Sequence, residues 1–150
     1  MAGDETTGVT IHRTVEELDA GPIAAQGAFP IEEDDDAGAV FKRAAEVAAD
    51  LLEGVLTEDE PHFEPQQEEG VTYAEKITPK DRELDLRRPA EELERTVRAL
   101  SPHIGARAKL QGRDVIVWRA RVEGSALVPV EVQPAGKRRM TYEEFLRGLR

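Results

Sequence analysis

The sequence has 150 residues, of which 39% are hydrophobic, and it contains no cysteine, which excludes disulfides and thiolate metal sites. Its net charge of −11 is unevenly divided: residues 1–75 carry 20 acidic and 3 basic side chains, and residues 76–150 carry 11 acidic and 17 basic ones. No apolar run approaches the length of a membrane span, and the first residues are acidic, unlike a basic signal region.

A strand followed by a tight turn is the first feature that the sequence predicts. Apolar and polar side chains alternate through Gly8–His12, the period-two pattern of a half-buried strand. Leu18 is then expected to pack. In the turn at Asp19–Pro22, Gly21 is able to adopt a positive φ, and the proline disfavours helix before it. On spacing alone, Asp19 more often caps such a turn through its own backbone than serves a site.

An acidic run and a long helix follow. Residues 22–31 read as extended, and the five consecutive carboxylates of Glu32–Asp36 come next. Such a run is solvated in a loop and favours the positive end of a following helix, so no metal site is predicted. A helix is predicted over residues 38–56, where apolar side chains recur at i, i+3 and i+4. This stripe has to cover a sheet or another helix, since each large side chain left exposed costs roughly 1.5–3 kcal/mol.

The middle of the chain is predicted to hold a connection, a strand and a second helix. Residues 57–70 carry prolines and glycine among acidic residues and are interpreted as a connection, and residues 71–77 as a strand. A helix is predicted over residues 89–100, with proline in its first turn. Glu94 and Arg98 form an i, i+4 pair on this helix, which by itself can account for the arginine.

The last third of the sequence has a β pattern. Strands are predicted over residues 106–110, 114–122 and 127–133, with a terminal helix over residues 142–149. Trp118 is expected in the core rather than on the surface as a platform for bases. His62 and His103 lie beside prolines and are expected to be solvated. The length and the uneven charge favour two small units over one core.

Several stretches, taken in order along the chain, resemble one family of enzymes. Gly8–His12 with Leu18–Pro22 is similar to the late part of the catalytic domain of formyltransferases that use 10-formyltetrahydrofolate. Residues 67–77, from Gln67 to Ile77, resemble the linker that leaves this domain in the methionyl-tRNA formyltransferase family. Three further stretches resemble the C-terminal domain of that family: Arg88–Leu93, Val97–Pro102 and Gln133–Lys137.

The resemblance implies a fold of the α/β + β class. Residues 1–66 would be the remnant of a Rossmann-like formyltransferase domain, and residues 67–85 a linker. Residues 86–150 would form a small, OB-like β-barrel that binds tRNA. The segment 123–130 is shorter than is usual in the family, so at least one strand pair is expected to be missing and the barrel to be incomplete.

The resemblance also implies the chemistry. The family transfers a formyl group from 10-formyltetrahydrofolate to the amino group of initiator methionyl-tRNA, without a metal. Asp19 matches the aspartate of the family's Leu-Asp-x-Gly turn, which would orient a histidine or relay a proton. Glu16, Glu17 and Leu18 would line the pterin pocket through their backbone. The family's upstream asparagine and histidine have no counterpart here, so the chain is expected to be truncated and inactive alone.

Contacts with tRNA are implied for the basic half of the chain. Lys76, Arg98, Arg107, Lys137 and Arg138 are the residues that the resemblance favours, although solvated strand-face cations and helical ion pairs are the default interpretation of such side chains. The composition, with no cysteine, no membrane-span candidate and acidic first residues, is expected of a cytoplasmic protein. The apolar side of the 38–56 helix is expected to meet the missing N-terminal half or another chain.

Two alternative functions remain open from the sequence. His12 lies seven residues before Asp19, a spacing that resembles an active-site histidine of the relative that formylates phosphoribosylglycinamide. His12 is therefore a second catalytic candidate, and a small amine is an alternative substrate. The other alternative is a non-enzymatic remnant that binds tRNA through its basic half.

Overall fold

The computed structural model of the chain describes residues 1–67 and 69–149; Glu68 and Arg150, which fall in the predicted linker and C-terminal domain, lie outside the described residues. The chain divides into two compact units. The hairpin unit comprises residues 4–33 and 39–75, and the sheet unit comprises residues 1–3, 34–38 and 76–150. The boundary after residue 75 largely separates the acidic half of the sequence from the basic half.

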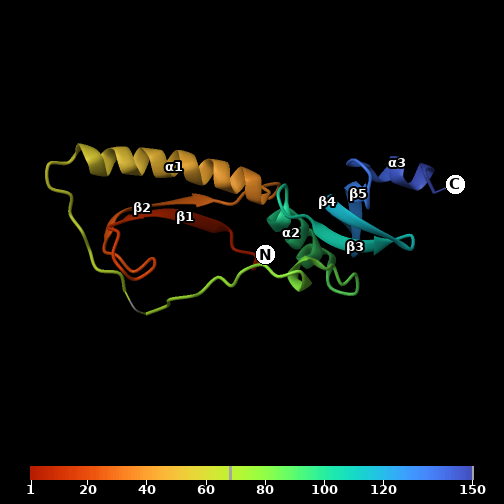
Figure 1. Cartoon of the computed structure of the whole chain (residues 1–150), viewed down its shortest axis with the longest axis horizontal. Coiled ribbons are helices and arrows are strands. Elements are labelled where there is room, and N and C mark those ends of the chain that lie inside the picture. The colour runs from red at the N-terminus through yellow and green to blue at the C-terminus, as the bar shows by residue number, and fades with distance from the viewer. Residues whose placement is uncertain (68, 150) are drawn as a thin grey trace. The chain divides into compact units, whose positions relative to one another are not determined.

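Two antiparallel strands begin the hairpin unit (Figure 1). β1 (Thr6–His12) pairs with β2 (Ile23–Pro30), and side chains alternate between a half-buried and an exposed face along β1, as the sequence pattern predicts. The register shifts between Ile11, which is opposite Ala25, and His12, which is opposite Ile23. This bulge leaves one residue of β2 without a partner at the end of the hairpin that carries the turn.

A long helix covers one face of this hairpin. α1 spans Ala37–Thr57, which confirms the helix predicted over residues 38–56, and it belongs to the hairpin unit from Ala39 onward. Val47 and Leu51 lie so close to Gly27 of β2 that a Cβ on this glycine would be 3.0 and 3.1 Å from them. The missing side chain at Gly27 therefore lets the helix approach the strand closely.

The opposite side of α1 exposes large apolar side chains. Phe41 and Leu56 are 70% and 73% exposed, and Leu52 is 44% exposed. Among the described residues of this unit, Phe29, at 7% exposed, is the only buried hydrophobic side chain. Part of the apolar stripe of this helix is therefore exposed. The hairpin unit has a thin core, stabilised mostly by half-buried contacts.

The segment that leads from the hairpin unit toward the sheet unit is irregular. The strand predicted over residues 71–77 is wrong, because residues 71–78 form neither strand nor helix. Tyr73 is 88% exposed and Val71 is 56% exposed. Alternating apolar residues specify a strand only where a neighbouring strand pairs with them, and none does so here in the described chain.

The sheet unit contains a helix packed on an open, four-stranded antiparallel sheet in the order β3-β4-β5-β6. Figure 1 labels the first three of these strands beside α2. Its elements are a short 3₁₀ turn (Lys80–Arg82), α2 (Ala90–Leu100), β3 (Ala106–Leu110), β4 (Arg113–Glu123), β5 (Ala126–Pro134), β6 (Met140–Thr141) and α3 (Tyr142–Arg147). The described strands do not close into a barrel, which agrees with the incomplete barrel expected from the short 123–130 segment. The helices and long strands match their predicted positions to within two residues, and β6 was not predicted.

The core of the sheet unit lies between α2 and the sheet. Leu93, Val97 and Leu100 fall on one face of α2 and are at most 3% exposed. They belong to one buried cluster with Val117 of β4 and Val132 of β5. This cluster is the main hydrophobic core among the described residues, so the sheet unit has much more buried apolar area than the hairpin unit.

Trp118 is buried beside the turn that follows α2. The residue is 7% exposed, and its Nε1–H donates to Gln133 Oε1 at 3.0 Å, which confirms its expected place in the core. Ser101 Oγ donates to the Trp118 carbonyl at 2.6 Å. The guanidinium of Arg139 lies 3.6 Å from the centre of the indole ring and donates to the Pro102 carbonyl at 3.0 Å. One face of the ring is therefore covered by a cation and is closed to a stacking base.

A capping box begins α3. The Glu144 amide donates to the Thr141 hydroxyl at 3.2 Å, and the Thr141 amide donates to Glu144 Oε2 at 2.9 Å. This backbone hydrogen bond, with a second one from the hydroxyl, lowers the pKa of Glu144 below its ordinary value. The stabilisation that the Glu144 carboxylate contributes to the cap is therefore retained above the ordinary carboxylate range and is lost as pH falls through the lowered pKa.

Candidate functional site

The turn that carries Asp19 connects the end of β1 to the start of β2. The Arg13 amide donates to the Pro22 carbonyl at 2.9 Å and so joins the two ends of the loop. Asp19 has a φ of 56°, in the left-handed region that aspartate tolerates better than most residues. Gly21, for which the sequence allowed this conformation, does not have a positive φ. The left-handed position of the turn is therefore Asp19 itself.

Gly21 is needed in the turn because there is no room for a side chain. A Cβ on this residue would lie 1.7 Å from the Arg13 carbonyl oxygen and 3.0 Å from His12 Nδ1. Both of these atoms belong to the opposite side of the loop. The glycine thus permits the close backbone approach that fixes the position of Asp19.

The Asp19 carboxylate is exposed to solvent and has no partner among the described residues. In the part of the chain that the structure describes, it makes no hydrogen bond or ion pair. Its main-chain carbonyl, in contrast, accepts a hydrogen bond from Gln66 Nε2 at 2.7 Å. A carboxylate with both oxygens free on a held backbone is suited to accept a proton or a hydrogen bond from a bound molecule.

His12, the second catalytic candidate, ends β1 and is half-buried. Its Nδ1 lies 3.1 Å from the Arg13 carbonyl, and as a donor in this contact it leaves the lone pair of a neutral ring on Nε2. No hydrogen bond joins His12 to Asp19 among the described residues. The two candidates therefore belong to the same loop region, one just before the loop and one near its end, and no hydrogen bond between them is found in the described chain.

The predicted cofactor-binding residues lie in the same loop. Glu16, Glu17 and Leu18 are all exposed, and their backbone groups make no hydrogen bond within the described chain. The expectation that Leu18 packs is wrong, since the residue is 87% exposed. The reason is that the thin hairpin unit offers no core beneath this loop. A role for these backbone groups in holding a pterin stays a prediction.

Part of the predicted connection, residues 57–70, folds back onto this loop. Ile23 and Glu64 exchange two backbone hydrogen bonds of 2.7 and 2.9 Å. The Arg13 guanidinium lies 4.0 Å from the centre of the Phe63 ring. Gln66 then reaches the turn itself. No local pattern announces these contacts, because they join residues more than forty positions apart.

Arg98, predicted to contact tRNA, is committed to contacts inside the sheet unit. Its Nε donates to both carboxylate oxygens of Glu94, at 2.8 and 2.9 Å, and its Nη1 donates to the Asp35 carbonyl at 2.8 Å. Its side chain is only 23% exposed. These contacts agree with the helical ion pair that the sequence offered as the structural explanation of this arginine.

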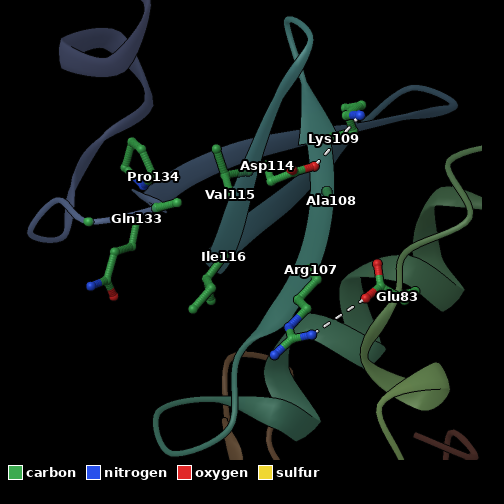
Figure 2. A pocket seen from close by; sticks show the side chains of 11 residues that line it. Glu83, Arg107, Ala108, Lys109, Asp114, Val115, Ile116, Gln133 and Pro134 are labelled. Atoms are coloured by element: carbon green, nitrogen blue, oxygen red, sulfur yellow. Dashed lines mark ion pairs between the residues drawn. The ribbon is translucent and has the colours of Figure 1, made fainter.

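Arg107 borders a hollow of about 580 Å³ across β3, β4 and the end of β5 (Figure 2). Figure 2 shows two ion pairs at this hollow, Arg107 with Glu83 and Lys109 with Asp114, each with an N···O distance of 3.9 Å. All four side chains are at least 48% exposed, so these pairs are weak. The hollow nevertheless carries two cations against two carboxylates, which gives it no net attraction for phosphate.

Lys137 and Arg138 are brought together at a second, more positive hollow. This hollow of about 370 Å³ is also lined by Arg113, and Glu144 is its one acidic residue. Neither Lys137 nor Arg138 forms a close salt bridge among the described residues, although the charge of Arg138 contributes to the lowered pKa of Glu144. Lys76 is exposed and lines neither hollow. The five predicted tRNA contacts therefore do not form one cluster, and Lys137 with Arg138 is the pair best placed for a phosphate.

Across residues 1–67 and 69–149, no three His, Asp or Glu side chains gather closely enough to hold a metal ion. None of the helices described has the length and apolarity needed to cross a bilayer.

Comparison with known proteins links both units to one family. The sequence model described as "Formyl transferase" matches residues 1–56, and the one described as "Formyl transferase, C-terminal domain" matches residues 76–126. Methionyl-tRNA formyltransferase of Halorhodospira halophila is 40% identical to the chain and matches 100% of it. The enzyme of Latilactobacillus sakei is 32% identical over 99% of the chain. The chain spans 57% and 56% of the lengths of these two relatives.

Solved structures show the same fold. Methionyl-tRNA formyltransferase from Clostridium thermocellum matches 88% of the chain with a TM-score of 0.74 and 18% identity, over 57% of its own length. HypX from Aquifex aeolicus in complex with tetrahydrofolic acid matches 96% of the chain with a TM-score of 0.69 and 19% identity, over 30% of its own length.

Proposed function

Because the chain belongs to the formyltransferase family, we propose that it carries out part of the transfer of a formyl group from 10-formyltetrahydrofolate to the amino group of initiator methionyl-tRNA. The observation that carries this proposal is the turn at Asp19, where a free carboxylate lies on a backbone that contacts from both sides hold in place. We assign residues 1–66 to the end of the catalytic domain, 67–85 to the linker and 86–150 to the tRNA-binding domain, in a cytoplasmic protein.

The proposed role of Asp19 follows from its geometry. In the transfer, the amine nitrogen bonds to the formyl carbon and the bond from that carbon to N10 of the folate breaks, while the amine loses a proton and N10 gains one. An exposed carboxylate can accept that proton or hold the histidine that does so. His12 Nε2, with its lone pair free, is the second group of this loop able to accept a proton. The backbone of Glu16, Glu17 and Leu18 would contact the folate.

The chain contains no asparagine, so the asparagine that the family resemblance implies as an oxyanion stabiliser has to come from outside these 150 residues. We therefore design a hybrid protein, in which the chain is joined to the part of the Halorhodospira halophila relative that lies outside the match. The hybrid is expected to formylate methionyl-tRNA, and the 150-residue chain alone is expected to show no transfer. The measurement is the formation of formylmethionyl-tRNA from labelled 10-formyltetrahydrofolate.

The same assay distinguishes the alternatives. A folded hybrid that formylates phosphoribosylglycinamide but not methionyl-tRNA would favour the small-amine function, for which the position of His12 is the supporting observation. A folded hybrid that binds tRNA and formylates neither substrate would favour the non-enzymatic remnant. Transfer by the chain alone would contradict the division of the active site that is proposed here.

We further propose that the sheet unit contacts the tRNA backbone at the hollow of Lys137, Arg138 and Arg113. Replacing Lys137 and Arg138 together by alanine is expected to weaken binding of the chain to methionyl-tRNA. It should also lower the slope of log affinity against log salt by roughly 1.4–1.8, since each phosphate contact contributes about 0.7–0.9. Binding is measured by titration at several salt concentrations.

A matched control removes the same charge elsewhere on the sheet unit. Arg87 pairs with Asp85 at 2.8 Å, and Arg88 pairs with Glu92, so the double variant Arg87→Ala, Arg88→Ala removes two arginines already committed to carboxylates. This variant is expected to keep most of the salt slope. Equal losses in both double variants would indicate a general charge effect and would contradict a contact at the hollow of Lys137 and Arg138.

A further inference from the structure

One side chain holds two carbonyl groups of the turn at once. The Nε2 amide of Gln66 donates to the Asp19 carbonyl at 2.7 Å and to the Gly21 carbonyl at 2.7 Å. A primary amide has two N–H groups in a fixed plane, so one such group can serve both carbonyls. These two carbonyls belong to the residues on either side of Ala20.

The conformation held in this way is one that the turn does not favour by itself. A non-glycine residue at a φ of 56°, as at Asp19, persists where its surroundings determine it. The loop from 13 to 22 has one further backbone tie, from the Arg13 amide to the Pro22 carbonyl. Among the described residues, Gln66 is the only side chain from outside the loop that hydrogen-bonds to Asp19 or Gly21.

The position of Gln66 is itself fixed by the segment that carries it. Glu64 pairs with Ile23 by two backbone hydrogen bonds, and Phe63 lies under the Arg13 guanidinium. The pairing of Glu64 with Ile23 therefore fixes the register of the segment two residues before Gln66. The contact of Gln66 with the turn is a consequence of this register and does not depend on a long flexible arm.

We propose that Gln66 is a positioning residue for Asp19: by donating to the carbonyls of Asp19 and Gly21 it holds the turn in the conformation that presents the carboxylate. We call the two hydrogen bonds from Gln66 to the carbonyls of Asp19 and Gly21 the Gln66 clamp. The catalytic meaning of this clamp rests on the proposed function, but the clamp itself is a property of the 150-residue chain. The neighbouring Gln67 makes no hydrogen bond in the described chain and offers a matched control.

Three substitutions separate the effect of the Gln66 N–H donors from the effect of its side-chain volume. Gln66→Ala removes the amide, Gln66→Glu keeps its shape but replaces the donors by acceptors, and Gln66→Lys restores donors on a chain of similar length. The probe is hydrogen exchange of the Arg13 amide in the full chain, with the ¹³C shifts of the Asp19 and Gly21 carbonyls. Exchange is expected to rise about three- to tenfold in the alanine and glutamate variants, to recover in the lysine variant and to stay unchanged in Gln67→Ala.

The clamp would be overturned if Gln66→Glu matched the parent chain, since this would indicate packing without donation, or if Gln66→Ala left the two carbonyl shifts unchanged. A second arm tests the catalytic meaning in the hybrid, where Gln66→Glu is expected to lower kcat more than it raises KM for tRNA. Intact clamp signals together with a hybrid that transfers no formyl group would contradict the proposed function alone. Loss of the clamp signals with unchanged kcat would contradict the positioning role alone.

Discussion

Replacing Asp19 by asparagine is expected to lower the rate of formyl transfer by the hybrid roughly 10²–10⁴-fold, the range that a positioned acid or base contributes. Asparagine has nearly the same size and tolerates the left-handed conformation, so the φ of 56° can be kept. The substitution removes the negative charge and the ability to take up a proton. Formylmethionyl-tRNA formation under single-turnover conditions measures the effect, and the affinity for tRNA should not change.

The control for this variant is Asp59→Asn. Asp59 is an exposed carboxylate of the same unit, in the bend after α1, and it makes no hydrogen bond or ion pair in the described chain. This variant is expected to keep full activity. If Asp19→Asn and Asp59→Asn transferred formyl groups at the same rate in a folded hybrid, Asp19 would be reduced to the turn cap that its spacing alone suggests.

Replacing Leu100 by alanine is expected to destabilise the sheet unit by about 2–5 kcal/mol, the cost of a large cavity in a packed core. Leu100 is 1% exposed, belongs to the main buried cluster and ends α2 directly before the Ser101 turn that supports Trp118. A small unit with a single core has little stability to lose. The measurement is urea denaturation followed through the amide signals of β4.

Leu86→Ala provides the matched comparison. Leu86 is in the same unit and is 51% exposed, so the same change of side chain is expected to cost less than about 1 kcal/mol. Similar midpoints of denaturation for the two variants would contradict the assignment of the core to α2 and the sheet. A loss confined to Leu100→Ala would support it.

The regular elements of the fold could be predicted from local patterns. The 3.6-residue period of α1 and the short alternating runs around β3–β5 depend on neighbours close in sequence, and here each run found a partner. The run around Tyr73 has a similar pattern and no partner, so its strand prediction is wrong. Pairing is a tertiary event, and a single sequence does not reveal whether it takes place.

The candidate site could be predicted only in part. Asp19 stands out because glycine and proline mark the turn around it, and the family resemblance adds its role. Gln66 carries no such mark, since a glutamine in a proline-containing connection resembles any solvated residue. Leu18 was expected to pack because it is apolar, but the burial of a loop residue depends on a core that the hairpin unit does not provide.

The indole of Trp118, covered by the Arg139 guanidinium, allows the unfolding of the two units to be followed separately by spectroscopy. It is the only tryptophan in the sequence, and it lies in the sheet unit, so tryptophan fluorescence, excited at a wavelength that tyrosine does not absorb, reports on that unit alone. Circular dichroism at 222 nm, an amide signal, instead includes the 21-residue α1. Two-state unfolding of the whole chain would make the two curves coincide, whereas independent units would separate them. The separation would measure the stability of the thin hairpin unit, which has no emitting indole of its own.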